Sequence, residues 1–157
     1  MKFNRVIAGK KAREAGNSFE DIFRAMAETQ GIGVIRIPNG STIKRTPQGI
    51  KTFPAPSPFD WILGHKGDAI LIDTKSLDKG TLSFSDLKTH QVKNLAKMEA
   101  QGICGGYVVN FRPLDQIVFF NAGLLKSLKR KQSLKPDDGI ILGGIDNFNT
   151  SILFQII

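Results

Sequence analysis

The sequence predicts an α/β fold in which helices flank a central mixed β-sheet. Apolar residues recur at helical spacing in two segments, and short runs rich in β-branched residues lie between and after them. The chain has 157 residues, of which 41% are hydrophobic, so it is long enough to bury a core. No stretch marks a boundary within it. We therefore expect one domain over residues 1–157.

The first helix is expected to begin at Asn17–Ser18, a pair suited to N-capping, and to end at Gly31. Apolar residues between these points recur at helical spacing, which indicates an amphipathic helix. The preceding segment, about residues 1–16, is basic and weakly patterned, so we expect an arm. Its candidates for DNA binding are Arg5, Lys10, Lys11 and Arg13.

A short strand is expected at 33–38, and a basic β-hairpin or stalk follows it at about 39–55. Pro47 and Gly49 supply the chemistry of the turn between the two arms of the hairpin. Both arms carry cations. Its candidates for DNA binding are Lys44, Arg45 and Lys51.

The remaining chain alternates strands with helices. A turn at 65–67 is expected to join strands at 59–64 and 68–75, and Ser85 can cap a helix that runs to Gln101. The later elements expected are strands at 104–111 and 116–121, a basic helix at about 122–131, and strand-like runs at 140–142 and 152–156.

Charge and cysteine content narrow the class of protein. The net charge of +8 favours a polyanionic partner, with nucleic acid ahead of an anionic membrane surface. The lone Cys104 can form neither an internal disulfide nor a zinc site. No signal peptide or membrane-spanning stretch is visible, so we expect a cytoplasmic protein without a membrane partner.

The 68–75 strand carries the clearest chemical signal. Side chains alternate along a strand, so Asp73 and Lys75 share one face while Ile70 and Ile72 point to the other. A hairpin turning at 65–67 would place Asp60 beside them. Asp60 and Asp73 are therefore candidates to bind one cation, with Lys75 next to it.

These residue types suit the cleavage of phosphodiester bonds. Mg²⁺ prefers carboxylate oxygens and keeps waters at its open positions. The ion polarises the scissile phosphate and activates a bound water, and a lysine stabilises the charge that develops in the transition state. We expect Mg²⁺ as the cofactor, with Mn²⁺ able to replace it, and no small-molecule cofactor.

Gln91 and Glu20 are further candidates for the catalytic site. Gln91 interrupts the apolar stripe formed by Leu87, Leu95 and Met98, where an amide without partners would cost about 1–3 kcal/mol. A metal-bound water or a carboxylate on the sheet would satisfy it, and we include it among the metal-site residues. Glu20 lies in the first turn of the first helix, from which it can also reach a metal. A second Asp-x-Lys, Asp86 to Lys88, is expected at the surface.

The chain resembles the PD-(D/E)xK nuclease superfamily and, more narrowly, the RecU family of Holliday junction resolvases. The resemblance spans about Gly16 to Phe120 and depends on the order and spacing of several segments. These segments are Gly16–Asp21, Phe59–Trp61, Leu71–Lys75, Phe84–Gln91 and Gln101–Cys104 leading to Asp115–Phe120.

The resemblance implies a restriction-endonuclease-like domain that works as a homodimer and nicks opposed strands of a DNA four-way junction with Mg²⁺. Asp60 and Asp73 correspond to metal-binding acids of the family, and Lys75 to its catalytic lysine. Gln91 matches the glutamine beside the metal, and Glu20 the acid carried on a helix. The basic segment from Ser41 to Phe53 corresponds to the stalk that enters the junction.

Three positions depart from the family pattern. Asp73 stands where a glutamate is usual, the stalk is shorter than in bacterial members, and Pro58 is one residue too early for a literal Pro-Asp pair. These departures leave room for a phage or archaeal-type member. Two other functions stay open: a restriction-like or flap-type endonuclease, and a non-enzymatic nucleic-acid-binding module.

Overall fold

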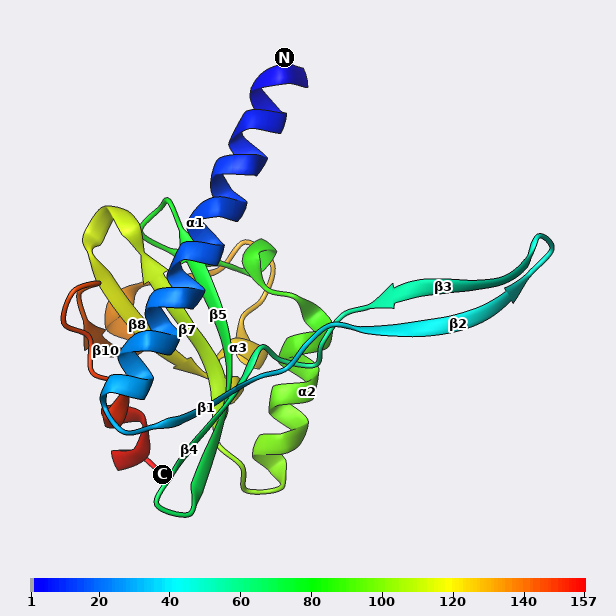
Figure 1. Ribbon diagram of the computed structural model, residues 1–157. Coiled ribbons are helices and arrows are strands. Elements are labelled where there is room, and N and C mark those ends of the chain that lie inside the picture. The colour runs from blue at the N-terminus through cyan, green and yellow to red at the C-terminus, as the bar shows by residue number, and fades with distance from the viewer. Residues whose placement is uncertain (1) are drawn as a thin grey trace.

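The computed structural model describes the backbone of residues 2–157 and the side chains of residues 14–16 and 18–157. A six-stranded sheet forms the body, and helices pack on both of its faces (Figure 1). The helices and strands are α1 (Lys2–Thr29), β1 (Gly33–Arg36), β2 (Gly40–Thr46), β3 (Gly49–Ala55), β4 (Trp61–His65), β5 (Asp68–Leu77), β6 (Leu82–Ser83), α2 (Thr89–Ala100), β7 (Gly105–Phe111), β8 (Gln116–Asn121), α3 (Ala122–Ser127), β9 (Ser133–Leu134) and β10 (Ile140–Gly143).

The main sheet has the strand order β1-β4-β5-β7-β8-β10. Strands β5 and β7 pair in parallel, with α2 in the connection between them, and the other neighbours pair antiparallel. A parallel pair needs such a crossover, whereas antiparallel neighbours can be joined by tight turns. The predicted α/β class, with a mixed sheet flanked by helices, is confirmed.

Two hydrophobic cores lie on opposite faces of the sheet. Ile70 and Ile72 of β5 pack in the core that also contains Phe19 and Phe23 of α1. Leu71 of the same strand packs in the other core, beneath α2 and α3. The alternation predicted for this strand is confirmed, so each polar residue on β5 can be assigned to a face.

Helix α1 begins much earlier than the sequence pattern suggested. It starts at Lys2 and continues through Asn17–Ser18, so the predicted N-cap at that pair is wrong. Residues 2–16 contain no proline, and the two glycines, Gly9 and Gly16, each cost only about 1 kcal/mol in a helix interior, which does not end it. The side chains of Arg5, Lys10, Lys11 and Arg13 lie outside the described residues.

Two other predicted helix boundaries also differ. Asp86 accepts a hydrogen bond from the Ser83 backbone and closes a 3₁₀ turn at Phe84–Asp86, so α2 starts only at Thr89. Helix α3 ends at Ser127, before Lys129–Lys131, because the buried Leu128 leaves it in an extended conformation.

The last predicted strand, 152–156, is wrong. Thr150–Gln155 forms a 3₁₀ helix instead. The side chain and backbone N–H of Thr150 both donate to Gln30 Oε1 at the end of α1. This anchor places Leu153 in the core beneath α1, where a strand added to the sheet could not lie.

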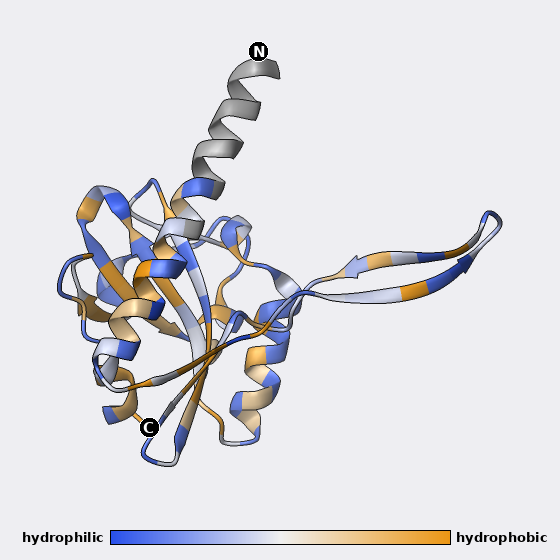
Figure 2. Ribbon diagram, in the orientation of Figure 1, coloured by the Kyte–Doolittle hydropathy of each residue, from blue (hydrophilic) through white to orange (hydrophobic). Residues whose placement is uncertain are grey.

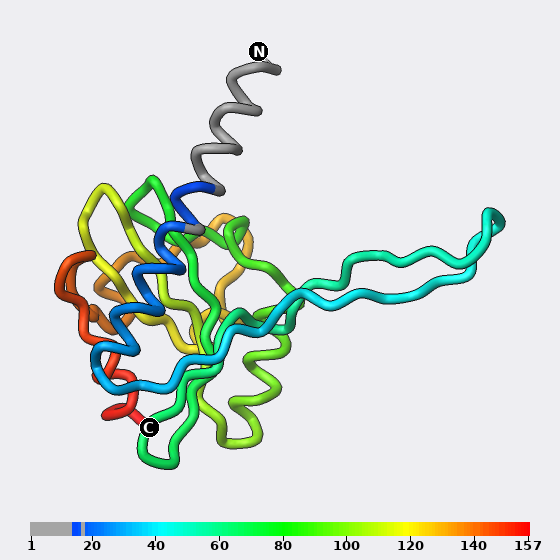
Figure 3. Tube along the Cα trace, in the orientation of Figure 1, coloured from blue at the N-terminus to red at the C-terminus, as the bar shows by residue number. Residues whose placement is uncertain are grey.

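Strands β2 and β3 form a separate two-stranded sheet, the ribbon, which projects far from the body (Figures 1 and 3). Its turn is closed at Thr46, whose hydroxyl donates to Gly49 O at 2.8 Å, and Gly49 has a φ of 113° that favours glycine. The predicted basic hairpin is confirmed. Figure 2 shows hydrophilic segments of the ribbon alternating with hydrophobic ones.

Within the described part of the chain, none of the helices is both long and apolar enough to cross a membrane.

The contact between α1 and the sheet can be tested at Phe23. Its fully buried ring stacks on Phe148, with 6.3 Å between ring centroids, and packs near Trp61. We expect Phe23→Ala to lower the free energy of unfolding by about 3–5 kcal/mol in urea denaturation, because it leaves a large cavity. The neighbouring Arg24→Ala, which removes only an exposed ion pair with Glu28, is expected to lower it by less than about 1 kcal/mol. Equal losses for the two variants would contradict this packing.

Candidate active site

The hairpin of β4 and β5 brings Asp60 and Asp73 together. Lys66 and Gly67 both have positive φ, as the tight turns that join two antiparallel strands require. Trp61 then pairs with Ile72, and the Asp60 N–H donates to Ile72 O at 3.1 Å. Asp60 therefore lies directly before this ladder and next to Asp73, as the sequence predicted.

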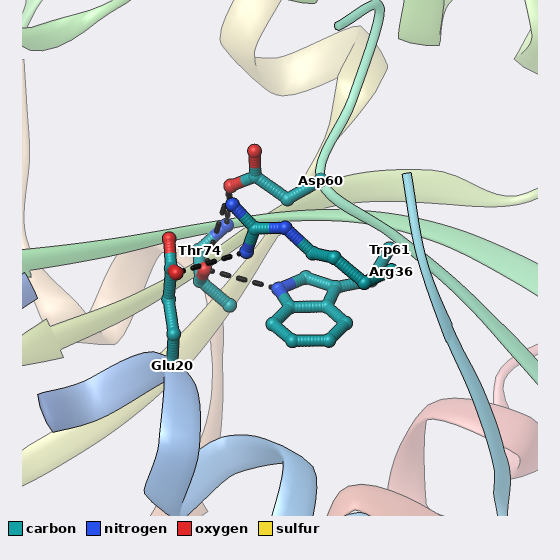
Figure 4. A network of polar contacts seen from close by, with 5 residues as sticks. All are labelled: Glu20, Arg36, Asp60, Trp61 and Thr74. Atoms are coloured by element: carbon teal, nitrogen blue, oxygen red, sulfur yellow. Dashed lines mark hydrogen bonds and ion pairs between the residues drawn. The ribbon is translucent and has the colours of Figure 1, made fainter. Parts of the chain in front are cut away.

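A network of hydrogen bonds holds the Asp60 carboxylate. Its Oδ2 accepts from the backbone N–H of Thr74 at 3.1 Å and lies 3.4 Å from the Thr74 hydroxyl. That hydroxyl also accepts from Trp61 Nε1 at 3.2 Å. Figure 4 shows the second Asp60 oxygen pointing away from this network. One carboxylate oxygen is thus fixed by the protein, and the other remains directed outward.

Asp73 is almost completely buried, with 2% of its surface exposed. Among the described residues, its Oδ1 has no hydrogen-bond partner. Burial raises the pKa of this carboxyl well above its ordinary value, and the nearby negative charge of Asp60 raises it further. A buried carboxylate without a partner is costly unless a cation neutralises it. The site therefore has the electrostatics of a cation-binding pair.

Lys75 lies two residues beyond Asp73 on the same face of β5. Burial lowers the pKa of its ammonium, and the negative charge of Asp73 opposes that shift. Its Nζ lies 5.5 Å from the centre of the Tyr107 ring, in a cation–π contact. Asp73 and Lys75 therefore share one partly buried environment.

Glu20 reaches the site from α1, where it meets a residue that the sequence analysis missed. Its Oε2 lies 2.9 Å from Arg36 Nη1. The Arg36 guanidinium in turn lies 4.7 Å from the centre of the Trp61 ring (Figure 4). Glu20 is thus paired with a cation at the site, and this pair connects α1 to β1.

Gln91 projects from α2 and is buried, with 3% of its surface exposed. Its Oε1 accepts a hydrogen bond of 3.2 Å from the Tyr107 hydroxyl. The predicted apolar stripe is partly wrong: Leu95 is buried as expected, but Val92 is its buried neighbour, and Leu87 precedes the helix. The expected need for a partner is confirmed. For the carbonyl oxygen, the partner is a tyrosine on the sheet.

One pocket collects these side chains. All five predicted catalytic residues line it, together with Arg36, Lys88 and the base of the ribbon. The complete set is Glu20, Arg36, Asn39, Pro54, Ala55, Pro56, Ser57, Asp60, Asp73, Thr74, Lys75, Lys88 and Gln91. The exposed Lys44, Arg45 and Lys51 lie outside the pocket, on the ribbon that starts at its rim.

Lys88 lines the pocket although it was not among the predicted site residues. It is exposed, as expected for the second Asp-x-Lys. Asp86 of the same motif is not part of the pocket, and it pairs with Lys79 at 2.7 Å.

Sequence signals existed for the two other residues that were missed. Tyr107 is the only tyrosine in the chain and lies in an otherwise apolar run, where its hydroxyl needs a partner. Arg36 alternates with apolar residues in a short strand. Nothing local shows that Arg36 meets Glu20, because that contact depends on how α1 crosses the sheet.

Comparison with protein families identifies the group to which this sequence belongs. The family described as RecU, Recombination protein U, matches residues 32–149, which is most of the chain. The chain belongs to the RecU family. The resemblance to a RecU-like Holliday junction resolvase that the motifs indicated is thereby confirmed. The match includes Asp60, Asp73, Lys75 and Gln91, and it begins after Glu20.

A solved structure supports the fold of this RecU-family chain. The chain is similar to Hjc of Archaeoglobus fulgidus, a Holliday junction resolvase from an archaeal hyperthermophile, with a TM-score of 0.57 and 17% sequence identity. The similarity covers 80% of this chain and 95% of Hjc. At this level of identity the comparison establishes the shared fold. A search of curated proteins finds no match to the sequence.

The buried charge of Asp73 predicts an unusual dependence of stability on pH. The unfolded chain releases this proton near pH 3.9, but the fold retains it to a higher pH because the pKa is raised. Without metal, stability therefore falls as pH rises from the unfolded pKa to the folded one. Asp73→Asn removes this charge, so we expect it to raise the Tm at neutral pH, by about 2–4 °C per kcal/mol recovered.

The measurement is thermal unfolding in EDTA between pH 4 and 8. Asp68→Asn is the control, since this aspartate lies exposed at the start of the same strand. A Tm for Asp73→Asn below that of the wild type at neutral pH would contradict the prediction.

Proposed function

We propose that this RecU-family protein is an Mg²⁺-dependent endonuclease that resolves DNA four-way junctions by paired nicks. The observation that carries the proposal is the pocket at the ribbon base, where a buried carboxylate with one unpartnered oxygen adjoins a second acid and a lysine. Hjc, which shares the fold, is a Holliday junction resolvase. Membership of the RecU family supports the same substrate.

The donor set fits a hard divalent cation. Asp60 and Asp73 would hold it, and no cluster of three or more His, Cys, Asp or Glu side chains suited to a metal occurs among the described residues. Two carboxylates are typical of Mg²⁺ sites, in which waters and substrate phosphate complete the coordination. When bound, such an ion polarises the phosphate and acidifies a water. Mn²⁺, with similar ligand preferences, is proposed to replace it.

The cations around the pocket would act on the DNA itself. Lys75, Arg36 and Lys88 surround the two acids, so they can contact the oxygens of a phosphate that enters. Lys75 is the proposed catalytic lysine, because it shares the face of β5 with Asp73 and is partly withdrawn from water. In such an environment a cation stabilises developing negative charge more strongly than in water.

The ribbon would hold the junction. Residues 29–59 contain no aspartate or glutamate, and Lys44, Arg45 and Lys51 are exposed along the ribbon. At the base of the ribbon, two residues that line the pocket are joined by a hydrogen bond: the Ser57 N–H donates to Asn39 Oδ1 at 3.1 Å. One DNA backbone could therefore place phosphates along the ribbon and another phosphate in the pocket. Arg5, Lys10, Lys11 and Arg13 of α1 are proposed to add further contacts.

Paired nicking requires two active sites, and a two-fold homodimer supplies them. The C-terminal apolar runs contain both buried and exposed side chains. Leu142 and Leu153 are buried in the core, whereas Ile141, Ile156 and Ile157 remain 41%, 43% and 53% exposed. We propose that these three isoleucines contribute to the surface between protomers.

Catalysis can be tested with Asp73→Asn on a labelled four-way junction. We expect the variant to bind the junction but not to cut it in Mg²⁺, because the neutral amide replaces a metal-binding carboxylate. Lys75→Ala is expected to slow cutting about 10²–10³-fold, and Asp68→Asn to leave it unchanged. Robust cutting by Asp73→Asn would contradict the assignment of the site.

Mapping of the products on all four strands separates the possible functions. Paired symmetric nicks support a resolvase, and one-sided or duplex-specific cuts support a restriction-like or flap-type enzyme. If binding occurs without any cutting, and Mg²⁺ chelation alters only the affinity, the chain is a non-enzymatic binding module.

The role of the ribbon can be tested by its salt dependence. Lys44 and Lys51 lie directly opposite each other in the ribbon register. We expect Lys44→Ala with Lys51→Ala to weaken junction binding and to reduce the slope of log K against log salt by about 1.8, since each lost phosphate contact contributes about 0.9. The control is Lys97→Ala with Lys129→Ala, two exposed cations outside the ribbon and the pocket. Equal slopes for both double variants would exclude the ribbon as a main DNA contact.

A further inference from the structure

Tyr107 forms hydrogen bonds with two residues that line the pocket, Lys88 and Gln91. It is fully buried on β7, and its backbone pairs in register with Asp73 of the neighbouring strand. Its hydroxyl oxygen accepts a hydrogen bond of 3.2 Å from the backbone N–H of Lys88, just before α2. The same hydroxyl donates to Gln91 Oε1, also at 3.2 Å. Tyr107 thus connects the central sheet to the first turn of α2.

The backbone fixes the direction of the first of these two hydrogen bonds. A backbone N–H can only donate, so at Lys88 the Tyr107 hydroxyl must be the acceptor. In the structure its single proton is donated to Gln91, whose carbonyl oxygen Oε1 is the acceptor. Burial, followed by the charge of Asp73, raises the pKa of Tyr107, so the phenol keeps its proton at neutral pH.

The other end of the Gln91 amide therefore carries only donors. Among the described residues its Nε2 has no hydrogen-bond partner, yet it is not one of the buried atoms sealed from solvent. Gln91 lines the pocket beside Asp60, Asp73 and Lys75. The group available to a ligand there is an NH₂, which binds anionic oxygens and cannot bind a metal ion.

We propose that Tyr107 is a positioning residue, which orients the Gln91 amide so that its NH₂ group donates to a phosphate oxygen of the bound DNA. This inference rests on the proposed function, because it requires a phosphate in the pocket. It also replaces the expected role of Gln91 beside the metal: Asp60 and Asp73 hold the cation, and Gln91 contacts the substrate. The Tyr107 ring has a second effect, since it supports the ammonium of Lys75.

The first experiment is a double-mutant cycle on junction cleavage, with Tyr107→Phe, Gln91→Ala and the two together. Tyr107→Phe keeps the ring under Lys75 and removes only the hydroxyl. We expect it to slow cleavage at saturating DNA about 10–100-fold, as is usual when a residue that orients an active-site group is lost. In the Gln91→Ala background it should cause no further loss, because Tyr107 acts through Gln91.

Val108→Ala is the matched control for packing. Val108 is equally buried and adjacent in the chain, but it faces the opposite core. Its effect on cleavage should multiply with that of Gln91→Ala, since it does not touch the hydrogen-bond chain. If the effects of Tyr107→Phe and Gln91→Ala multiply in the same way, Tyr107 has only a structural role and the proposal is overturned.

The second experiment measures Mg²⁺ binding to the full chain by calorimetry, without DNA. Gln91→Ala and Tyr107→Phe should leave the Kd for Mg²⁺ unchanged, whereas Asp73→Asn should abolish binding. A clear weakening by Gln91→Ala would show that the glutamine binds the metal and would overturn the inference.

The two proposals fail in different ways. If the wild type cuts another DNA but not a four-way junction, the resolvase function fails, and the cycle is then measured on the DNA that is cut. If the wild type cuts junctions but the effects of the two variants multiply, only the role of Tyr107 fails. Absence of cutting on every DNA with Mg²⁺ would overturn both.

Discussion

A carboxylate buried in the middle of the sheet is the constraint on which the rest of this structure depends. Asp73 lies on the central strand β5, with a hydrophobic core on each side of the sheet. Such a charge is tolerated only where something compensates it. The arrangement around it fits this requirement: Lys75 lies on the same face, Arg36 and Lys88 line the pocket, and the second oxygen of Asp60 points away from the network that holds the first.

Much of the fold could be predicted from residue pattern because the relevant forces are local. Alternation along β5 assigned Asp73 and Lys75 to one face, and the turn at Lys66–Gly67 placed Asp60 beside them. The basic hairpin was visible from its turn residues. The start of α1 was not, since a cap-like pair at Asn17–Ser18 occurs within a longer helix that nothing interrupts. The C-terminal 3₁₀ helix depends on Gln30, 120 residues away from Thr150, and local pattern cannot report such a contact.

The candidate site also contains residues that local pattern could predict and residues that depend on long-range contacts. All five predicted catalytic residues line one pocket. They could be predicted because each either lies on a strand whose side chains alternate or matches a family motif. The residues missed, Arg36, Lys88 and Tyr107, acquire their importance from neighbours on other elements. Arg36 meets Glu20 only because α1 crosses the sheet, and Tyr107 meets Gln91 only because α2 packs over β7. The sequence thus indicates which groups carry the chemistry, and the fold determines which atoms they present.

The close approach of β7 to its neighbours has a consequence for how this chain can vary. A methyl group at Gly106 would lie 2.8 Å from the Phe119 ring and closer still to the Phe120 carbonyl of β8. Any side chain there would push β7 away from β8 and carry the next residue, Tyr107, out of register with Asp73. Gly106 is not part of the pocket, yet its tolerance to substitution should be as low as that of the acids. A position without chemistry of its own thereby determines the geometry of the candidate site.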